Sequence, residues 1–366
     1  MIFWRRRFNP KKCIHEVFSP VRGEQVLVIM DVPHGDQEYI QEWKDRPAIA
    51  RKWIQAFNEL GLVTSPILEY PATGFDNAEL PRNGTQLGVE VPIEDVISEH
   101  QIILAITQYD ATAPLTLIGR RQPHVRIVST YGIEARMEQT SLLVDLKRLA
   151  RKTAFLKDLL DRTNGARVNF NTSQEMYFDL RFRKAFSDDG HAHSTRHKQT
   201  VTTLPGGAAI VNPYEGERED FESQTIGILP MYVDNQLAQL YVEANKIVRV
   251  IGGGSSVNNL RAWFDADEAR RNIALFGLGC NERSRVIGRR IEDQKAGFFC
   301  GFGRSDFVGG QVGLDRFVNR GGELYRELVF AKGSPISAYK ITLTLDDQTN
   351  RTIMEKGQYT IFSGKR

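Results

Sequence analysis

Residues 26–30 read VLVIM, and this apolar stretch is bounded by Gly23 and Pro33. A short, continuous, β-branched run between chain-breaking residues is typical of a strand that is buried on both faces. Both faces of such a strand must be covered by other elements, which is the arrangement found in α/β folds. We therefore expect these residues to form a core strand of a parallel sheet.

The chain around this strand alternates between helical and strand patterns. Apolar residues at helical spacing follow it, at Ile49, Trp53, Phe57 and Leu60, and Gly61 ends that pattern. Two further apolar runs are residues 102–106 (IILAI) and 125–129 (VRIVS), and a leucine-rich helix is expected over residues 135–161. Strands separated by helices imply right-handed crossovers. Residues 21–162 are therefore predicted to form a Rossmann-like α/β domain with a parallel sheet, preceded by a basic arm over residues 1–20.

The pattern changes after Asn164 and Gly165, where strand follows strand. The expected strands are residues 166–171, 209–211, 237–242, 247–251, 297–302, 338–345 and 358–362, with the last two forming a hairpin. One helix is expected over residues 257–269. Residues 163–366 are therefore predicted to form a second domain with a mixed or antiparallel sheet.

Composition limits the class of protein. Hydrophobic residues make up 41% and charged residues 25% of the 366 residues, as in ordinary globular proteins, and no apolar run reaches 18 residues, so no membrane partner is expected. A net charge of +3 is too weak to indicate nucleic acid binding. The three scattered cysteines, Cys13, Cys280 and Cys300, do not form a disulfide framework and favour a reducing, cytoplasmic location.

Three histidines share one short segment, His191, His193 and His197. Alternate residues of an extended chain point to the same side, so His-x-His is a recurrent metal-ligand spacing. A polar loop that happens to contain histidines is the alternative reading. Residues 252–256 (GGGSS) lack the Lys-Ser/Thr ending of a phosphate-binding P-loop, so a strand-to-helix turn is expected there.

Three segments of the second half resemble the aminopeptidase T family of metallopeptidases, to which 2,5-dihydroxypyridine dioxygenases are related. Residues 204–213 (LPGGAAIVNP) resemble the family's LPxGEVxxAP, residues 273–281 (IALFGLGCN) its LAELGIGxN, and residues 289–300 (RRIEDQKAGFFC) its LEDEKxxGTVH. The resemblance implies an aminopeptidase T type fold for the second domain. It also implies the family's metal site of two glutamates, two histidines and an aspartate.

Carrying that site over places most of its ligands on residues that cannot bind metal. The glutamates fall on Ala208 and Leu275, the histidines on Cys300 and Gly313, the aspartate on Asp315, and a tyrosine near the first histidine on Phe307. Alanine and leucine have no lone pairs with which to hold a pair of cations and the attacking water. Of the metal ligands, only the aspartate is retained.

The leading hypothesis is therefore a non-catalytic homologue without a cofactor. It would bind a peptide, or a precursor peptide in natural product biosynthesis, in an inter-domain cleft at these former metal positions. One alternative is an enzyme of aminopeptidase or dioxygenase type with one Zn or Fe at His191, His193 and His197. Another is a structural partner in a homodimer, an assembly that the resemblance also implies.

Overall fold

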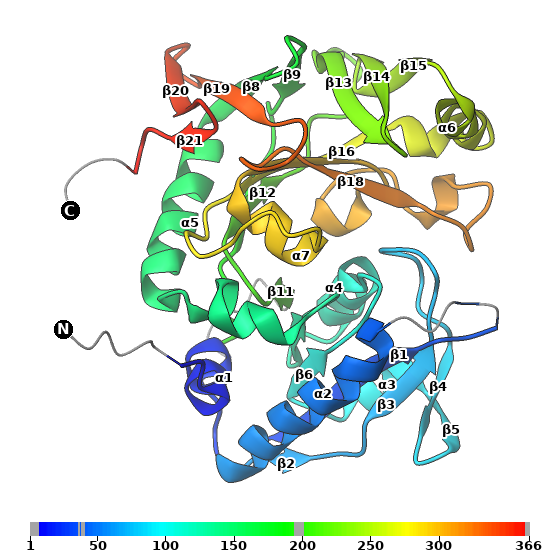
Figure 1. The fold of residues 1–366 in the computed structure, drawn as a ribbon, viewed down its shortest axis with the longest axis vertical. Helices are drawn as coiled ribbons and strands as arrows, with labels where there is room; N and C mark the ends of the chain where they lie inside the picture. Colours follow the sequence, from blue (N-terminus) through cyan, green and yellow to red (C-terminus); the bar gives the residue numbers. More distant parts are fainter. Residues whose placement is uncertain (1–6, 36, 38–40, 194–200, 363–366) are drawn as a thin grey trace.

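The computed structural model describes residues 7–35, 37, 41–193 and 201–362 and divides them among three sheets. In the view of Figure 1, sheet A forms the lower half, sheet C lies across the middle and sheet B forms the top. In the described residues, no helix is long and apolar enough to cross a membrane.

Sheet A is mostly parallel, with strand order β11-β7-β6-β1-β3-β4-β5 and β2 beside β1. Its strands are β1 (Gln25–Val32), β2 (Val63–Thr64), β3 (Leu68–Pro71), β4 (Asn83–Gln86), β5 (Val89–Pro92), β6 (Ile102–Ala105), β7 (Arg126–Ser129) and β11 (Val201–Thr203). Strand β1 is buried on both faces, because Val26 and Val28 face one apolar core while Leu27 and Ile29 face another. The prediction of a doubly covered core strand is confirmed.

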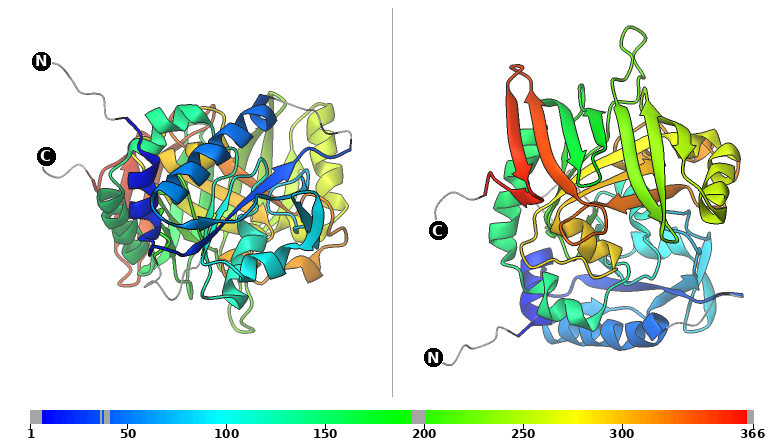
Figure 2. Two further views of the ribbon diagram at one scale, coloured as in Figure 1. Left: turned by 90° about the horizontal axis from the view of Figure 1, so that it is seen from below. Right: turned by 45° about the horizontal axis from the view of Figure 1, so that its top comes forward.

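Helices cover both faces of sheet A, as the alternating sequence pattern requires. They are α1 (Pro10–Phe18), α2 (Gln41–Glu59), α3 (Ile93–Ser98) and α4 (Thr112–Arg121), whereas α5 (Leu146–Leu160) lies along the other half of the molecule. Residues of α1 and α2 pack on the core that contains Val26, and residues of α3 and α4 pack on the core that contains Leu27. The left view of Figure 2 shows α1 and α2 on one side of the sheet.

Sheets C and B are antiparallel and lie beyond sheet A. Sheet C has the order β10 (Phe186–Asp188), β12 (Ala208–Val211), β16 (Ile273–Gly279), β17 (Phe298–Gly303) and β18 (Tyr325–Val329). Sheet B has the order β15 (Lys246–Ile251), β14 (Gln236–Glu243), β13 (Ile226–Val233), β9 (Glu175–Asp179), β8 (Thr163–Phe170), β19 (Ala338–Leu345), β20 (Asn350–Glu355) and β21 (Gln358–Tyr359). Figure 2 (right) shows the strands of sheet B side by side. The helices α6 (Ser255–Asp265) and α7 (Arg290–Asp293) accompany these sheets.

Two expected elements differ in extent. The helix expected from residue 135 consists of two 3₁₀ turns, Ala135–Gln139 and Ser141–Leu143, before α5 starts after Asp145. Asp145 caps α5 by accepting a hydrogen bond from the backbone N–H of Arg148, which fixes a new helix start inside the apolar pattern. The partner of β19 in the terminal hairpin is β20 and not residues 358–362, because the chain already turns where Asp347 bonds Thr349.

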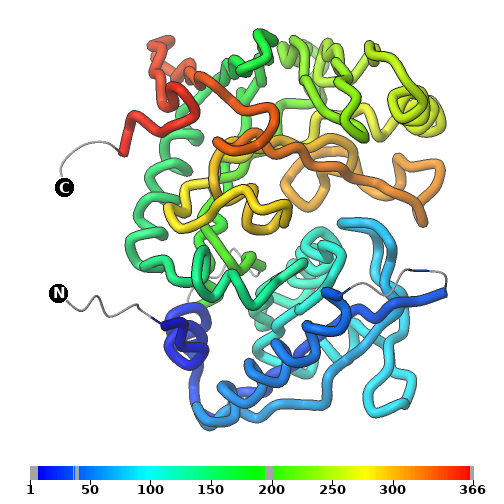
Figure 3. Tube along the Cα trace, in the orientation of Figure 1, coloured from blue at the N-terminus to red at the C-terminus, as the bar shows by residue number. Residues whose placement is uncertain are grey.

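The chain passes between the two halves more than once (Figure 3). After β10 in sheet C it returns to sheet A as β11, which pairs in parallel with β7, and then re-enters sheet C as β12. One apolar cluster also contains residues of α1, α2, α5 and sheets A, B and C. The two halves therefore share a core.

A buried ion pair holds the carboxyl end of β1. Asp31 and Arg46 are each 1% exposed and form an ion pair. Asp31 also accepts hydrogen bonds from the backbone N–H groups of Gln108, at 2.7 Å, and Tyr109, at 3.1 Å, in the loop after β6. The chain adds strands on one side of β1 up to β5 and then on the other side from β6. Ligands of open α/β sheets bind at such a reversal of strand order.

Replacement of Asp31 by alanine should lower the free energy of unfolding by about 3–5 kcal/mol, because Arg46 would remain buried without its partner. Glu268→Ala removes the exposed ion pair with Lys246 and should change stability little. Urea denaturation of both variants measures the difference. Equal losses would contradict the structural role of the buried pair.

Candidate functional site

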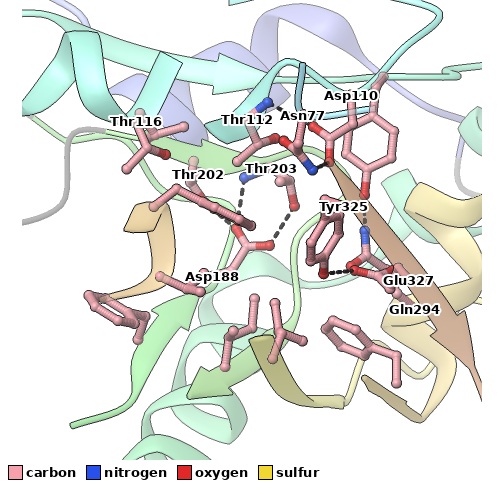
Figure 4. Close-up of a pocket in the computed structure, with 18 of the residues that line it drawn as sticks. Asn77, Asp110, Thr112, Thr116, Asp188, Thr202, Thr203, Gln294, Tyr325 and Glu327 are labelled. Atoms are coloured by element: carbon pink, nitrogen blue, oxygen red, sulfur yellow. Dashed lines mark hydrogen bonds between the residues drawn. The ribbon is translucent and has the colours of Figure 1, made fainter. Parts of the chain in front are cut away.

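A cavity of about 130 Å³ lies between the carboxyl edge of sheet A and one face of sheet C (Figure 4). Its polar lining residues are Asn77, Asp110, Thr112, Thr116, Arg120, Tyr131, Asp188, Thr202, Thr203, Gln294, Lys295, Tyr325 and Glu327. Its apolar lining residues are Phe186, Val201, Ile210, Leu275, Phe299, Phe307 and Val308. This volume is enough for a small molecule or for the end of a longer one.

Strand geometry decides which residues of each sheet reach the cavity. Asp110 and Tyr131 follow β6 and β7, whose carboxyl ends meet at one edge because the strands are parallel. On the antiparallel β17 and β18, Phe299 and Glu327 face the cavity while the intervening residues Cys300 and Leu328 pack into the core behind. The site therefore belongs to both halves of the molecule.

A buried ion pair inside the cavity joins β10 of sheet C to the loop between β16 and β17. Lys295 is 0% exposed, and its Nζ lies 2.5 Å from Oδ2 of Asp188 in β10. The same carboxylate accepts hydrogen bonds from the hydroxyls of Thr202 and Thr203 in β11 and from the Thr203 backbone N–H, at 2.7 Å. Both carboxylate oxygens are thus occupied, and the edges of sheets A and C are tied together.

The segment Glu292-Asp293-Gln294-Lys295, singled out by the resemblance, acts as a scaffold. Glu292 accepts hydrogen bonds from the hydroxyls of Thr140 and Ser141, each at 3.1 Å. Asp293 accepts hydrogen bonds from backbone N–H groups in the loop that precedes α7. Gln294 donates to the hydroxyl of Tyr131. The segment thus positions Gln294 and Lys295 in the cavity.

Two further carboxylates lie in the cavity, Glu327 on β18 and Asp110 after β6. Burial raises the pKa of the Glu327 carboxyl to about 7; Arg290 opposes the shift and Asp110 adds to it. Burial also raises the pKa of Asp110, although Arg290 and hydrogen bonds from Thr112 oppose the rise. Both carboxylates therefore favour the neutral form more than they would in water.

Gly301 leaves room for the ring of Tyr325, which lies beside Glu327. Gly301 stands opposite Glu327 in the β17–β18 pair, and the Tyr325 ring covers it. A Cβ at residue 301 would come within 2.3 Å of the Tyr325 hydroxyl oxygen. From this place Tyr325 donates a hydrogen bond of 3.1 Å to Oε2 of Glu327.

The residues at the predicted former metal positions are only partly together. Leu275 and Phe307 line the cavity, and Ala208 packs with them in one apolar cluster. Cys300 lies in the core on the opposite face of sheet C, where it pairs with Phe276. A shift of one residue along a strand changes the face, so Phe299 occupies the cavity side in place of Cys300.

The last two predicted positions lie outside the cavity lining. Gly313 precedes the 3₁₀ turn Leu314–Arg316, which contains Asp315. The side chain of Asp315 is 76% exposed and pairs with Arg316 at 3.6 Å. Asp315 therefore stands at the surface.

The histidines expected as an alternative metal site lie beside α1. His193 Nε2 is 2.8 Å from the backbone oxygen of Glu16, and His191 Nδ1 is 3.3 Å from Asp189. Neither histidine lines the cavity. His197 falls outside the described residues.

The donor set of the cavity does not fit the metal centre that the resemblance implies. Ala208, Leu275 and Phe299 cannot donate to a cation. Across the described ranges, no group of three His, Cys, Asp or Glu side chains is arranged to hold one metal ion. The carboxylates that are present belong to other strands and loops, and one of them already pairs with Lys295.

Sequence reasoning did not identify the polar lining. Asp110 follows a predicted parallel strand, and the rule that ligands bind at the carboxyl edge of such a sheet could have indicated it. Glu327 lies on β18, a strand that was not among those expected, so its direction could not be inferred. Asp188 and Lys295 are 107 residues apart in sequence, and only the fold brings them together.

Among the solved structures that match, two are similar to this chain over nearly its whole length. Over 94% of this chain and 93% of the other, the structure is similar to 2,5-dihydroxypyridine dioxygenase from Pseudomonas putida KT2440, with a TM-score of 0.62 and 16% identity. It is also similar to wild-type AmpT from Thermus thermophilus over 96% of this chain and 98% of the other, with a TM-score of 0.58 and 14% identity. No protein-family model matches, and no curated protein matches by sequence.

These matches define the fold class. The parallel sheet A with its helices and the antiparallel sheets C and B form an aminopeptidase T-like two-domain fold. The predicted fold class is confirmed. At such low identity the similarity concerns the fold alone, and the chemistry of the cavity must be argued from its own residues.

Loss of the Lys295 charge should destabilise the protein strongly. In Lys295→Met, Asp188 would remain buried without its cation, and the free energy of unfolding should fall by about 3–5 kcal/mol. Lys246→Met, at an exposed lysine of β15, is the matched control and should cost little. Equal unfolding midpoints for the two variants would show that the buried pair does not contribute to stability.

Glu327 should make stability depend on pH. The unfolded chain releases the Glu327 proton near its ordinary pKa of 4.5, while the folded protein keeps it to about 7. The folded state therefore binds more protons in this window, and its stability falls as pH rises through it. Glu327→Gln removes the effect, so its stability relative to the wild type should increase from pH 5 to pH 8 by about 1–2 kcal/mol. Urea denaturation at both pH values measures this, with Glu323→Gln as the baseline; a pH-independent difference would contradict it.

Proposed function

We propose that this protein binds a peptide in the cavity between sheets A and C and does not hydrolyse it. An apolar side chain of the peptide packs on the wall formed by Leu275, Phe299 and Phe307, with Ala208 packed in the same apolar cluster. The observation that carries the proposal is this wall, because the resemblance places the glutamates of a metal site on Leu275 and on Ala208, and both belong to the apolar cluster. A pocket of this kind binds by burying apolar surface and orients its ligand through a few polar groups.

The open side of the cavity is suited to a ligand that extends outward. Among the lining residues, Arg120 and Phe186 are exposed, so they mark the side that faces solvent. The guanidinium of Arg120 donates to the backbone oxygens of Asp306, at 2.9 Å, and Phe307, at 2.8 Å, which holds this rim. One end of a peptide would fill the cavity while the rest left between α4 and β10.

The alternatives have less support. A metal enzyme built on His191 and His193 would need these side chains near the cavity, and both contact other groups beside α1. Association into a homodimer and a role with a precursor peptide in natural product biosynthesis remain hypotheses. An exposed apolar face on sheet B, which includes Ile226 and Tyr232, is where association of two copies would be sought.

Binding without turnover can be tested with tripeptides of the form X-Ala-Ala, each with a free and with an acetylated amino terminus. Calorimetric titration should detect binding that is strongest when X is apolar, and chromatography should detect no cleavage after addition of zinc, cobalt or ferrous iron. Leu275→Asn should weaken binding about tenfold or more, because it places an amide in the apolar wall.

Leu237→Asn is the matched control for this experiment, since Leu237 lies on the outer face of sheet B and is 38% exposed. Its binding should equal that of the wild type. Absence of binding by every peptide, or metal-dependent cleavage of any of them, would overturn the proposal.

A further inference from the structure

The charges around the cavity do not balance. Asp188 pairs with Lys295, and Asp76 pairs with Arg290, whose charge also acts on Glu327 and Asp110. Glu327 and Asp110 remain, and the hydrogen bonds found for their carboxylates come from uncharged donors.

The donors to Asp110 are the side-chain amide of Asn77, at 3.0 Å, and the backbone N–H of Thr112, at 2.8 Å. Arg120 is the other cation of the lining, but it stands at the rim and is bound to backbone oxygens. Four carboxylates, Asp76, Asp110, Asp188 and Glu327, thus share the two cations Arg290 and Lys295, so negative charge is in excess when all four are ionised.

One oxygen of Glu327 has no partner in the described structure. Tyr325 donates to Oε2, whereas Oε1 is out of contact with solvent and has no hydrogen bond. A buried carboxylate oxygen without a donor is costly, so an unpaired one in a cavity indicates a donor supplied from outside. Figure 4 shows Glu327 beside Tyr325 and Gln294, with Asp110 and Asn77 on the sheet A side of the cavity.

We propose that Glu327 and Asp110 form a binding site for a protonated primary amine, and that the ligand carries this amine on an apolar body. In a peptide ligand the group is the α-amino group, and the first side chain packs against Leu275 and Phe299. The inference rests on the proposed function and adds the direction in which the ligand enters. An ammonium group supplies the missing charge and three donors, one of which satisfies Oε1 of Glu327.

The rings around the carboxylates fit the same ligand. Tyr131, Tyr325 and Phe299 line the cavity together with Glu327, and aromatic faces attract a cation that has lost its water. A metal ion fits less well, because the hydroxyls of Tyr131 and Tyr325 are already hydrogen-bonded, to Gln294 and Glu327, and Phe299 offers no ligand atom. A carboxylate ligand would face repulsion from both acidic groups.

The test compares Leu-Ala-Ala with N-acetyl-Leu-Ala-Ala by calorimetric titration of the full-length protein at pH 7.5. We expect acetylation to weaken binding about tenfold or more, since it removes the charge and two of the donors. Glu327→Gln should weaken binding of the free peptide to a similar extent and leave the acetylated peptide almost unchanged. This coupling between variant and ligand is specific to a direct contact, because a merely structural effect would weaken both peptides.

Two further variants keep the experiment decisive. Glu323 lies just before β18 and pairs with Arg326 outside the cavity. The variant Glu323→Gln should therefore bind both peptides as the wild type does. Glu327→Asp keeps the charge and should bind the free peptide better than Glu327→Gln does. Circular dichroism of each variant checks that it is folded.

The outcomes separate the two proposals. Equal binding of the free and acetylated peptides by the wild type would overturn the amine site and leave peptide binding intact. Absence of binding by both forms of the whole tripeptide set would overturn the proposed function and the amine site with it. Stoichiometric binding of Zn²⁺ that is lost in Glu327→Gln, without any effect of acetylation, would assign the two carboxylates to a metal.

Discussion

The buried pair of Asp188 and Lys295 is the interaction on which the arrangement of this molecule depends. Lys295 comes from the loop between β16 and β17, Asp188 from β10, and the threonine donors to Asp188 from β11 of sheet A. The pair lies within sheet C and its loop, and the threonine hydrogen bonds to Asp188 connect it to sheet A beside the cavity. A buried lysine is tolerated only with such a partner, so the position of the loop and the position of the strand determine each other.

The same face of sheet C carries both the apolar wall and the carboxylate of Glu327. Leu275 and Phe299 lie on adjacent antiparallel strands, and Glu327 follows on the next. The side chains of Leu275 and Phe299 have no atom that coordinates a metal, so this part of the face offers apolar surface. The loop beside this face is held by hydrogen bonds of Glu292, Asp293 and Gln294 to backbone and side-chain groups, and none of these bonds involves a cation.

Sequence reasoning identified residues of the site in some cases and misplaced them in others. Ala208, Leu275 and Phe307 were expected near one another, and they share one apolar cluster. Cys300 was placed beside them by motif spacing alone. In the structure the period of two along β17 puts Phe299 in the cavity and Cys300 in the opposite core. A one-residue error in alignment therefore moves the predicted residue to the wrong face of the sheet. Glu327 escaped notice because its strand has no distinctive pattern.

The sequence by itself determined the local structure and the class of fold. The apolar run of β1, the helical spacing of α2 and the change of pattern after residue 165 follow from short-range preferences that each segment carries. Only the tertiary structure decided the composition of the site, because Asp110, Asp188, Lys295 and Glu327 come from separate elements. Their distances depend on how sheet A packs against sheet C, and this packing is a sum of long-range contacts that no single segment encodes.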